Sequence, residues 1–250
     1  MQARAKPTVA LVHGAWADAS SWTGVIQLLQ AAGHPVLAVQ LDLATLAADV
    51  AVTRGVLAAH ADPTVLVGHC YGGAVVGEAG VGAPHVIGLV YVAAFAPAEG
   101  ESVLTAAAGF PRAPGFEYLV PDDRPGYLRI DPVAYPQVFM QDVDPAEARA
   151  LAVTQRAVAD VALSAPVGVP AWRTLPSWYL VSEDDRMVNP DAERALAARM
   201  GATTTTVRGA SHASPVSHPA EVAEAIMAAA RGAGAGERKV ASETAGDPDD

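Results

Sequence analysis

The segment Gly68-His69-Cys70-Tyr71-Gly72-Gly73 joins two runs of different character, residues 63–68 and residues 71–79. The first run is apolar and predicts a buried strand, and the second is rich in small residues and predicts a helix. Glycines on either side of Cys70 allow a tight strand-to-helix turn in which residue 70 takes strained dihedral angles. The Cys70 thiol is then expected at the amino end of the helix, where the helix dipole favours a thiolate.

Short apolar runs alternate with helical patterns on both sides of this turn. Besides residues 63–68, five strands are expected, at residues 8–12, 35–41, 86–95, 177–181 and 203–208. The helical patterns between and after them cover residues 20–32, 44–60, a segment that begins at Asn189 and Pro190, and residues 219–231. This order predicts an α/β fold with a mostly parallel six-stranded sheet that has helices on both faces.

The alternation stops between residues 97 and 175, a stretch rich in proline, glycine and aromatic residues. It is too long for a plain connection and predicts an inserted cap. The core is then expected to comprise residues 1–96 and 176–231. Residues 232–250 show no periodic pattern, which predicts a disordered tail.

Composition excludes several classes of protein. Hydrophobic residues make up 51% of the chain and charged residues 17%, which rules out disorder as its main state. A net charge of −11 makes nucleic acids and anionic membranes poor partners. The longest apolar run, residues 86–96, is shorter than the roughly 20 residues of a spanning helix, and residues 1–7 lack a signal peptide's apolar region. The single cysteine, Cys70, excludes an internal disulfide framework and a zinc ribbon, so a cytoplasmic location is expected.

Two further residues complete a candidate catalytic triad. Asp185 follows the expected strand at 177–181, and His212 follows the expected strand at 203–208. With Cys70 they give the chain order nucleophile, acid, histidine, and all three lie at carboxyl ends of strands, where open α/β sheets bind ligands. Asp184 is the rival for the acid because it is the adjacent residue, and Glu183 is a weaker third candidate.

Backbone amides near the turn are candidates for an oxyanion hole. The N–H of Tyr71 follows the nucleophile, and the N–H of Ala15 lies in His13-Gly14-Ala15-Trp16, directly after the first strand. Aromatic side chains at this end of the sheet and in the cap are expected to line the substrate pocket, namely Trp16, Phe95, Phe139 and Trp172. The histidine, aspartate and glycine spacings match neither a metal site nor a dinucleotide site, so no metal or cofactor is expected.

Five segments together carry a resemblance to a known family. They are HGAWADASSW (13–22), GHCYGG (68–73), YVAAFAPAEGES (91–102), WYLVSEDDRMVNP (178–190) and SHASPVSHP (211–219). In these the chain resembles the α/β-hydrolase superfamily, and within it the branch of small esterases and hydroxynitrile lyases. The resemblance implies an α/β-hydrolase fold and a catalytic triad, and it does not fix a substrate.

Two departures from the family pattern bear on the chemistry. The family usually has serine in the tight strand-to-helix turn, known as the nucleophile elbow, where this chain has Cys70. Thiol elbows also occur in dienelactone hydrolases, polyester synthases and some thioesterases; the other interpretations of Cys70 are an inert buried cysteine and an introduced replacement of serine. The related hydroxynitrile lyases carry a lysine just after the catalytic histidine, where this chain has Ala213, which argues against cyanohydrin cleavage.

The expected activity is therefore hydrolysis of an ester, thioester or lactone of a small to medium hydrophobic substrate through an acyl-enzyme on Cys70. One alternative is an acyltransferase or synthase that uses the same acyl-cysteine. The other is a ligand-binding protein built on a hydrolase core. A small molecule is the expected partner, and a homodimer is compatible with the sequence.

Overall fold

A central sheet organises the molecule. The computed structural model describes residues 6–244, and of residues 235–244 only the backbone. Six strands pair in the order β2-β1-β3-β4-β8-β9, and every pairing is parallel. They are β1 (Thr8–Val12), β2 (Val36–Val39), β3 (Thr64–His69), β4 (Val86–Val92), β8 (Ser177–Ser182) and β9 (Thr203–Val207). The predicted six-stranded α/β fold is confirmed, with an entirely parallel sheet.

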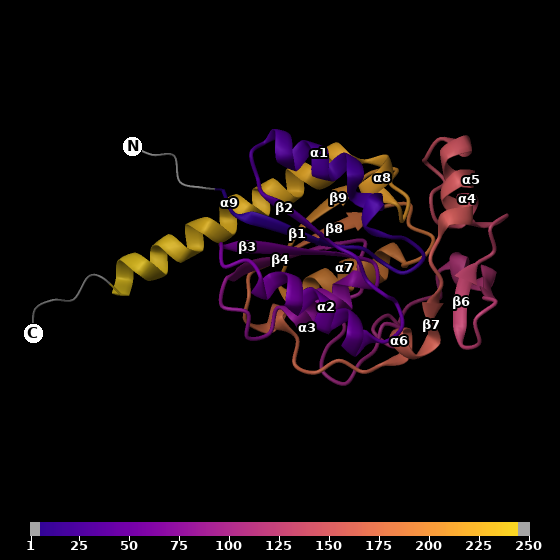
Figure 1. The fold of residues 1–250 in the computed structure, drawn as a ribbon, viewed down its shortest axis with the longest axis horizontal. Coiled ribbons are helices and arrows are strands. Elements are labelled where there is room, and N and C mark those ends of the chain that lie inside the picture. The colour runs from indigo at the N-terminus through magenta and orange to yellow at the C-terminus, as the bar shows by residue number, and fades with distance from the viewer. Residues whose placement is uncertain (1–5, 245–250) are drawn as a thin grey trace, which may run out of the picture.

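Helices cover both faces of this sheet (Figure 1). Along β1, Val9 and Leu11 belong to one hydrophobic cluster and Ala10 and Val12 to the other, because side chains alternate between the faces of a strand. The first cluster packs under α1 (Thr23–Ala31) and α9 (Pro219–Thr244). The second packs under α2 (Leu46–Ala58), α3 (Gly72–Ala79) and α7 (Pro190–Met200).

The last helix is longer than its sequence pattern predicted. The expected disorder from residue 232 is wrong for residues 232–244, which continue α9 to Thr244. Gly232 lies so close to the Trp178 ring that a Cβ there would come within 2.8 Å of it, and Ala233 is buried. Packing against β8 thus continues the helix through Ala233, and its remaining turns extend beyond the sheet (Figure 1). Residues 245–250 lie outside the described residues.

Residues 97–175, called the insertion below, form a small structure of their own. Its strands β5 (Leu119–Pro121), β6 (Tyr127–Ile130) and β7 (Val158–Ala159) make an antiparallel sheet that the sequence did not predict. Its helices are α4 (Tyr135–Val138), α5 (Pro145–Thr154) and α6 (Asp160–Ser164), with 3-10 turns η2 (Pro114–Tyr118) and η3 (Ala171–Arg173). Figure 1 shows β6, α4 and α5 beyond the carboxyl ends of the central strands.

Two short elements near the site complete the fold, η1 (Ala19–Trp22) and α8 (Ser214–Ser217). Both follow loops that leave the carboxyl ends of central strands, β1 and β9. No helix within residues 6–244 combines the length and the apolar character needed to cross a membrane.

Candidate active site

The turn around Cys70 has the strained geometry of a nucleophile elbow. Cys70 joins β3 to α3 with a φ of 53°, in the left-handed region that side chains rarely adopt. A Cβ on Gly68 would lie 2.5 Å from the Gly72 carbonyl oxygen, and one on Gly72 would lie 2.7 Å from the His13 carbonyl oxygen. Backbone therefore packs directly on backbone here, which requires glycine at both positions.

This close packing makes the elbow glycines essential for stability. We expect Gly68→Ala to lower the free energy of unfolding by about 3 kcal/mol or more, because the added methyl meets rigid backbone. Gly55→Ala in α2 is the matched control, since nothing lies within 4 Å of its added Cβ, and alanine there should stabilise the helix by about 0.5–1 kcal/mol. Urea denaturation of both variants measures the difference, and equal stability of the two would contradict this account of the turn.

The structure brings Asp185, and not Asp184, to His212. The Nδ1 atom of His212 lies 2.6 Å from Oδ2 of Asp185, and both side chains are fully buried. The other oxygen of Asp185 accepts the backbone N–H groups of Met187 at 2.6 Å and Val188 at 2.8 Å. Asp184 is exposed and contributes only its backbone to this region.

Electrostatics at the site favour a protonated imidazole. Burial lowers the pKa of His212, but the Asp185 carboxylate and the Cys70 sulfur together raise it, to about 10. The Nε2 atom of His212 is buried and makes no hydrogen bond of standard geometry with any group among the described residues. The Cys70 side chain is the other group, besides Asp185, that raises the pKa of this ring. A protonated His212 beside Asp185 is therefore the state that this environment supports at neutral pH.

His69 and Phe139 fix the position of the His212 ring. The Nε2–H of His69 donates to the His212 carbonyl oxygen at 2.8 Å, and the two ring centroids lie 4.7 Å apart. Burial first, and then the charge of His212, hold the pKa of His69 well below its ordinary value, so His69 stays neutral. Phe139 meets the His212 ring edge to face at 4.8 Å. The catalytic imidazole is thus held on two sides by uncharged rings.

Two backbone amides near Cys70 are candidates for an oxyanion hole. Within residues 6–244, the N–H groups of Ala15 and Tyr71 donate to no other protein group. The loop that carries Ala15 touches the elbow, because a Cβ on Gly14 would lie 2.5 Å from the Cβ of Cys70. His13 supports this loop as a neutral ring: burial lowers its pKa to about 4, and its Nε2 accepts the Leu41 N–H at 2.9 Å.

Two cavities lie beside residues that neighbour Cys70, Asp185 and His212. The larger one, about 340 Å³, has Phe95 in its wall together with Met187 and Val188. The Phe95 N–H donates to the Cys70 carbonyl oxygen at 3.0 Å, and the N–H groups of Met187 and Val188 donate to Asp185. The wall of this cavity is therefore bonded to both Cys70 and Asp185. The smaller one, about 30 Å³, is lined by Trp16, His69 and Phe139 among others.

Of the four aromatic residues expected to line a pocket, three lie on these cavities: Phe95 on the larger, and Trp16 and Phe139 on the smaller. Trp172 lines neither. Its indole N–H donates to the Pro97 carbonyl oxygen at 3.3 Å, and Arg173 and Arg199 lie over its ring. It anchors η3 against the start of the insertion.

Among residues 6–234, whose side chains the structure describes, no group of three histidine, cysteine, aspartate or glutamate side chains is arranged to hold a metal ion. Comparison with known proteins adds the family. Residues 9–225 match the model of the Alpha/beta hydrolase family. The chain belongs to this family, and it is an enzyme of hydrolase type. Among curated proteins, none matches it by sequence.

Solved structures with this fold include several that resemble this α/β hydrolase closely in shape. A pyrethroid hydrolase from Sphingobium faniae JZ-2 is 23% identical over 90% of this chain and 97% of its own, with a TM-score of 0.76. Polyneuridine aldehyde esterase is 20% identical over 89% of this chain and 98% of its own, with a TM-score of 0.76. A methylesterase from Arabidopsis is 19% identical, with a TM-score of 0.72, and covers 89% of this chain and 98% of its own. At these identities the likeness shows the fold.

Sequence reasoning missed one residue that supports the elbow of this α/β hydrolase. Asp49, in α2, is fully buried and accepts the hydroxyl of Tyr71 at 2.8 Å on one oxygen. Its other oxygen accepts the N–H groups of Asp42 and Leu43. The sequence feature that could have revealed this role is the position of Asp49 on the same side of α2 as Leu46, Val50 and Leu57.

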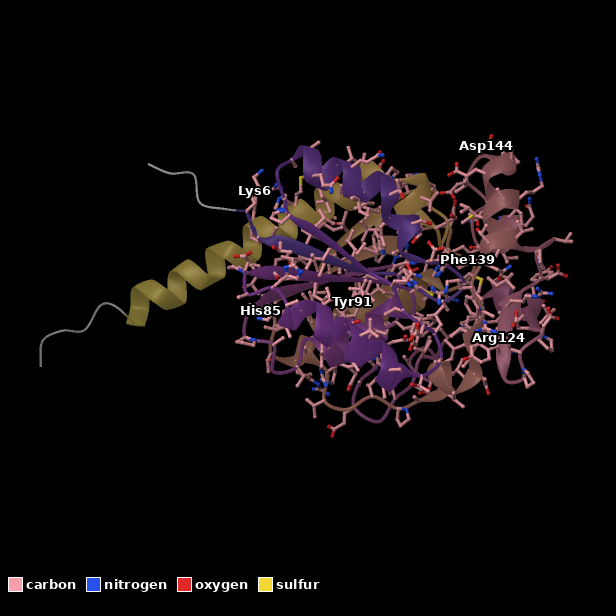
Figure 2. All side chains as sticks on the ribbon, viewed as in Figure 1. Lys6, His85, Tyr91, Arg124, Phe139 and Asp144 are labelled. Atoms are coloured by element: carbon pink, nitrogen blue, oxygen red, sulfur yellow. The ribbon has the colours of Figure 1, made fainter. Side chains whose placement is uncertain are left out.

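The sequence also did not show how the insertion holds the catalytic loops. The Phe139 carbonyl oxygen accepts the Ala213 N–H at 3.1 Å, and the side chain of Gln141 donates to the Asp184 carbonyl oxygen at 2.6 Å. Asp142 accepts the Ser211 N–H at 2.9 Å, one residue before the catalytic histidine. Figure 2 shows Phe139 where the insertion meets the carboxyl ends of the central strands. Residues 139–142 of the insertion thus bond to the two loops that carry Asp185 and His212.

Proposed function

We propose that this protein hydrolyses esters, thioesters or lactones of small to medium hydrophobic acids through a covalent intermediate on Cys70. The observation that carries the proposal is the buried hydrogen bond between Asp185 and His212, with the side chain of Cys70 also interacting with the imidazole. Membership of the Alpha/beta hydrolase family and the esterases among its structural neighbours support esterase-like activity.

The groups at the site provide each step of acyl transfer. The Cys70 thiolate attacks the carbonyl carbon while its former proton resides on His212, and the oxyanion forms beside the N–H groups of Ala15 and Tyr71. The intermediate collapses, His212 gives its proton to the departing alcohol or thiol, and a thioester remains on Cys70. Neutral His212 then takes a proton from water, hydroxide adds to the thioester, and the thiolate leaves as the acid is released.

The substrate class follows from the cavity beside the triad. A cavity of about 340 Å³ is larger than the roughly 150 Å³ that accommodates benzene in a protein interior, so a ring system fits. Its walls are mainly apolar, with Phe95, Phe110 and Phe116 supplying aromatic surface. We place the acyl or aryl part of the substrate there, with the insertion acting as a cap over it. The structural neighbours include a pyrethroid hydrolase and a methylesterase.

Acyl transfer to another acceptor is the second candidate, favoured by the burial of the nucleophile. Cys70 is 2% exposed, so bulk water has little access to its thioester in this conformation. An alcohol or amine bound in the cavity would then compete with water. Product analysis with and without an added alcohol or amine distinguishes the two reactions: transfer products at the expense of the free acid favour the second candidate.

The nucleophile is tested through its own chemistry. Wild-type protein incubated with a slowly hydrolysed activated ester should gain the mass of one acyl group, and Cys70→Ala should gain none. A thiolate is a good leaving group, so its adduct with an ordinary alkyl ester tends to revert to substrate. We therefore expect Cys70→Ser to keep the fold and to lower the preference for activated esters and thioesters over alkyl esters by at least about tenfold.

Intact-mass spectrometry and kcat/KM on matched ester pairs make this measurement. Circular dichroism and thermal melting of each variant serve as the control for folding. Wild-type turnover by a folded Cys70→Ala variant would overturn the proposed function. Higher activity of Cys70→Ser on every substrate would show that the thiol is a replacement for the nucleophile that the site was built around.

A further inference from the structure

Glu193 is a buried carboxyl group that the mechanism above does not use. It lies in the first turns of α7 and is completely inaccessible to solvent. Its Oε2 accepts the Ser182 N–H at 3.1 Å, at the end of β8, three residues before the catalytic acid. Its Oε1 is buried and makes no regular hydrogen bond within residues 6–244. A fully buried carboxyl group with only one donor is poorly compensated if it is ionised.

The group that faces Glu193 is the Asp185 carboxyl, with which it makes a side-chain contact. Asp185 already receives three hydrogen bonds, from Met187 N–H, Val188 N–H and His212. A carboxylate has about four acceptor sites, so one remains for Glu193. Two carboxyl groups in contact cannot both be ionised without a large cost, and the one that orients His212 is the one that must carry the charge.

The other ionisable groups near Glu193 do not neutralise it. Arg194 is the cation that acts on it, but the guanidinium pairs with Asp191 on the exposed side of α7 at 2.9 Å. Tyr179 is the other neighbour, and its hydroxyl donates to the Ala94 carbonyl oxygen, so its proton is already committed. Burial first, and then the charge of Asp185, raise the pKa of Glu193 well above its ordinary value of 4.5.

We propose that Glu193 is a positioning residue, held as the neutral acid, that donates its carboxyl proton to the Asp185 carboxylate and so fixes the acid that orients His212. This inference rests on the proposed function in that it assigns Asp185 to the triad. Glu193 touches neither substrate nor reacting atoms; it acts through Asp185. A negative charge is therefore not what the position requires. It requires a hydrogen-bond donor toward Asp185 and an acceptor for Ser182.

Glutamine satisfies both requirements without titrating, so the pair Glu193→Gln and Glu193→Leu tests the proposal. Glu193→Gln should keep kcat/KM within about threefold of wild type, with the same pH profile. Glu193→Leu removes the donor and should lower kcat at least about tenfold with little change in KM, because orientation of the histidine serves the reaction step more than binding. Steady-state kinetics on one activated ester measures all three proteins.

Stability against pH gives a readout that does not depend on activity. Above about pH 4.5 the unfolded chain releases the Glu193 proton and the folded chain keeps it, so wild type loses stability as pH rises. Glu193→Gln has no such loss. Relative to Glu193→Gln, the unfolding equilibrium constant of wild type should therefore grow up to about tenfold per pH unit from about pH 5 upward. The exposed Glu224 in α9 gives the matched control, Glu224→Gln, whose difference from wild type should stay constant with pH.

A difference between wild type and Glu193→Gln that does not change with pH would overturn the proposal. So would a folded Glu193→Gln that is as inactive as Glu193→Leu, since that result would mean that the charge is needed. Failure of the proposed function looks different. In that case Cys70→Ala retains turnover while the pH-dependent gap of Glu193→Gln persists.

Discussion

Replacing His212 by alanine should lower kcat by at least about a hundredfold while leaving the protein folded. In the proposed mechanism the imidazole carries the proton of Cys70, passes it to the leaving group and later activates water, and loss of general acid–base catalysis removes a factor of about 10²–10⁴. His212 is fully buried between His69 and Phe139, so alanine leaves a small polar gap and the loop keeps its bonds from Ser211 and Ala213 to the insertion.

Single-turnover and steady-state kinetics on an activated ester measure the effect. His60→Ala is the matched control, because His60 is exposed just past the end of α2 and precedes the amino end of β3, whereas Cys70 follows its carboxyl end. It should behave as wild type. Unchanged turnover by a His212→Ala variant that melts cooperatively would remove His212 from the mechanism.

Asp185→Asn should lower kcat by about 10³–10⁴, since only a carboxylate holds the imidazole in the productive tautomer and stabilises its charged form. Here the carboxylate also contributes to the elevated pKa of His212, about 10. With asparagine that contribution disappears, so His212 releases its proton at lower pH. In wild type, the raised pKa of His212 stabilises the folded protein below pH 6.5, and this stabilisation is lost as pH rises toward 10. The pH-dependent loss of unfolding free energy should be smaller in Asp185→Asn.

The adjacent residue supplies the control for this second prediction. Asp184→Asn changes an exposed side chain and leaves the backbone bonds of residue 184 in place. We expect its kcat to lie within about threefold of wild type, as for a surface substitution. If Asp184→Asn proved the more damaging of the two, the acid would have to be assigned to Asp184.

The central sheet could be predicted because parallel strands are buried on both faces. Residues 8–12 are all buried in β1, and a strand covered on both sides reads as an unbroken apolar run. The elbow could be predicted in part for a local reason: Gly68 is dictated by contacts with the backbone of Gly72 and Gly73, a few residues along the chain, whereas Gly72 packs on the distant backbone of His13. Local constraints of this kind are visible in a single sequence.

The insertion could be located but not described from the sequence. Its strands have three, four and two residues, too short for a periodic pattern, and they exist because distant segments pair with one another. The same holds for Trp172, whose aromatic character could not say that it turns toward Pro97 and not toward a cavity. Glu193 stands among Asp191 and Arg194, as on a solvated helix face, and only the docking of α7 on β8 reveals its burial.

The bonds from Phe139, Gln141 and Asp142 to the catalytic loops have a consequence for the lifetime of the enzyme. Thiolates oxidise readily, and the higher oxidation states of cysteine are irreversible in most settings. Here Cys70 is 2% exposed, and residues 139–142 bond to the loops that carry Asp185 and His212. Oxidation of a cysteine depends on its exposure as well as on its reactivity. Burial of Cys70 therefore protects the resting protein against oxidative inactivation.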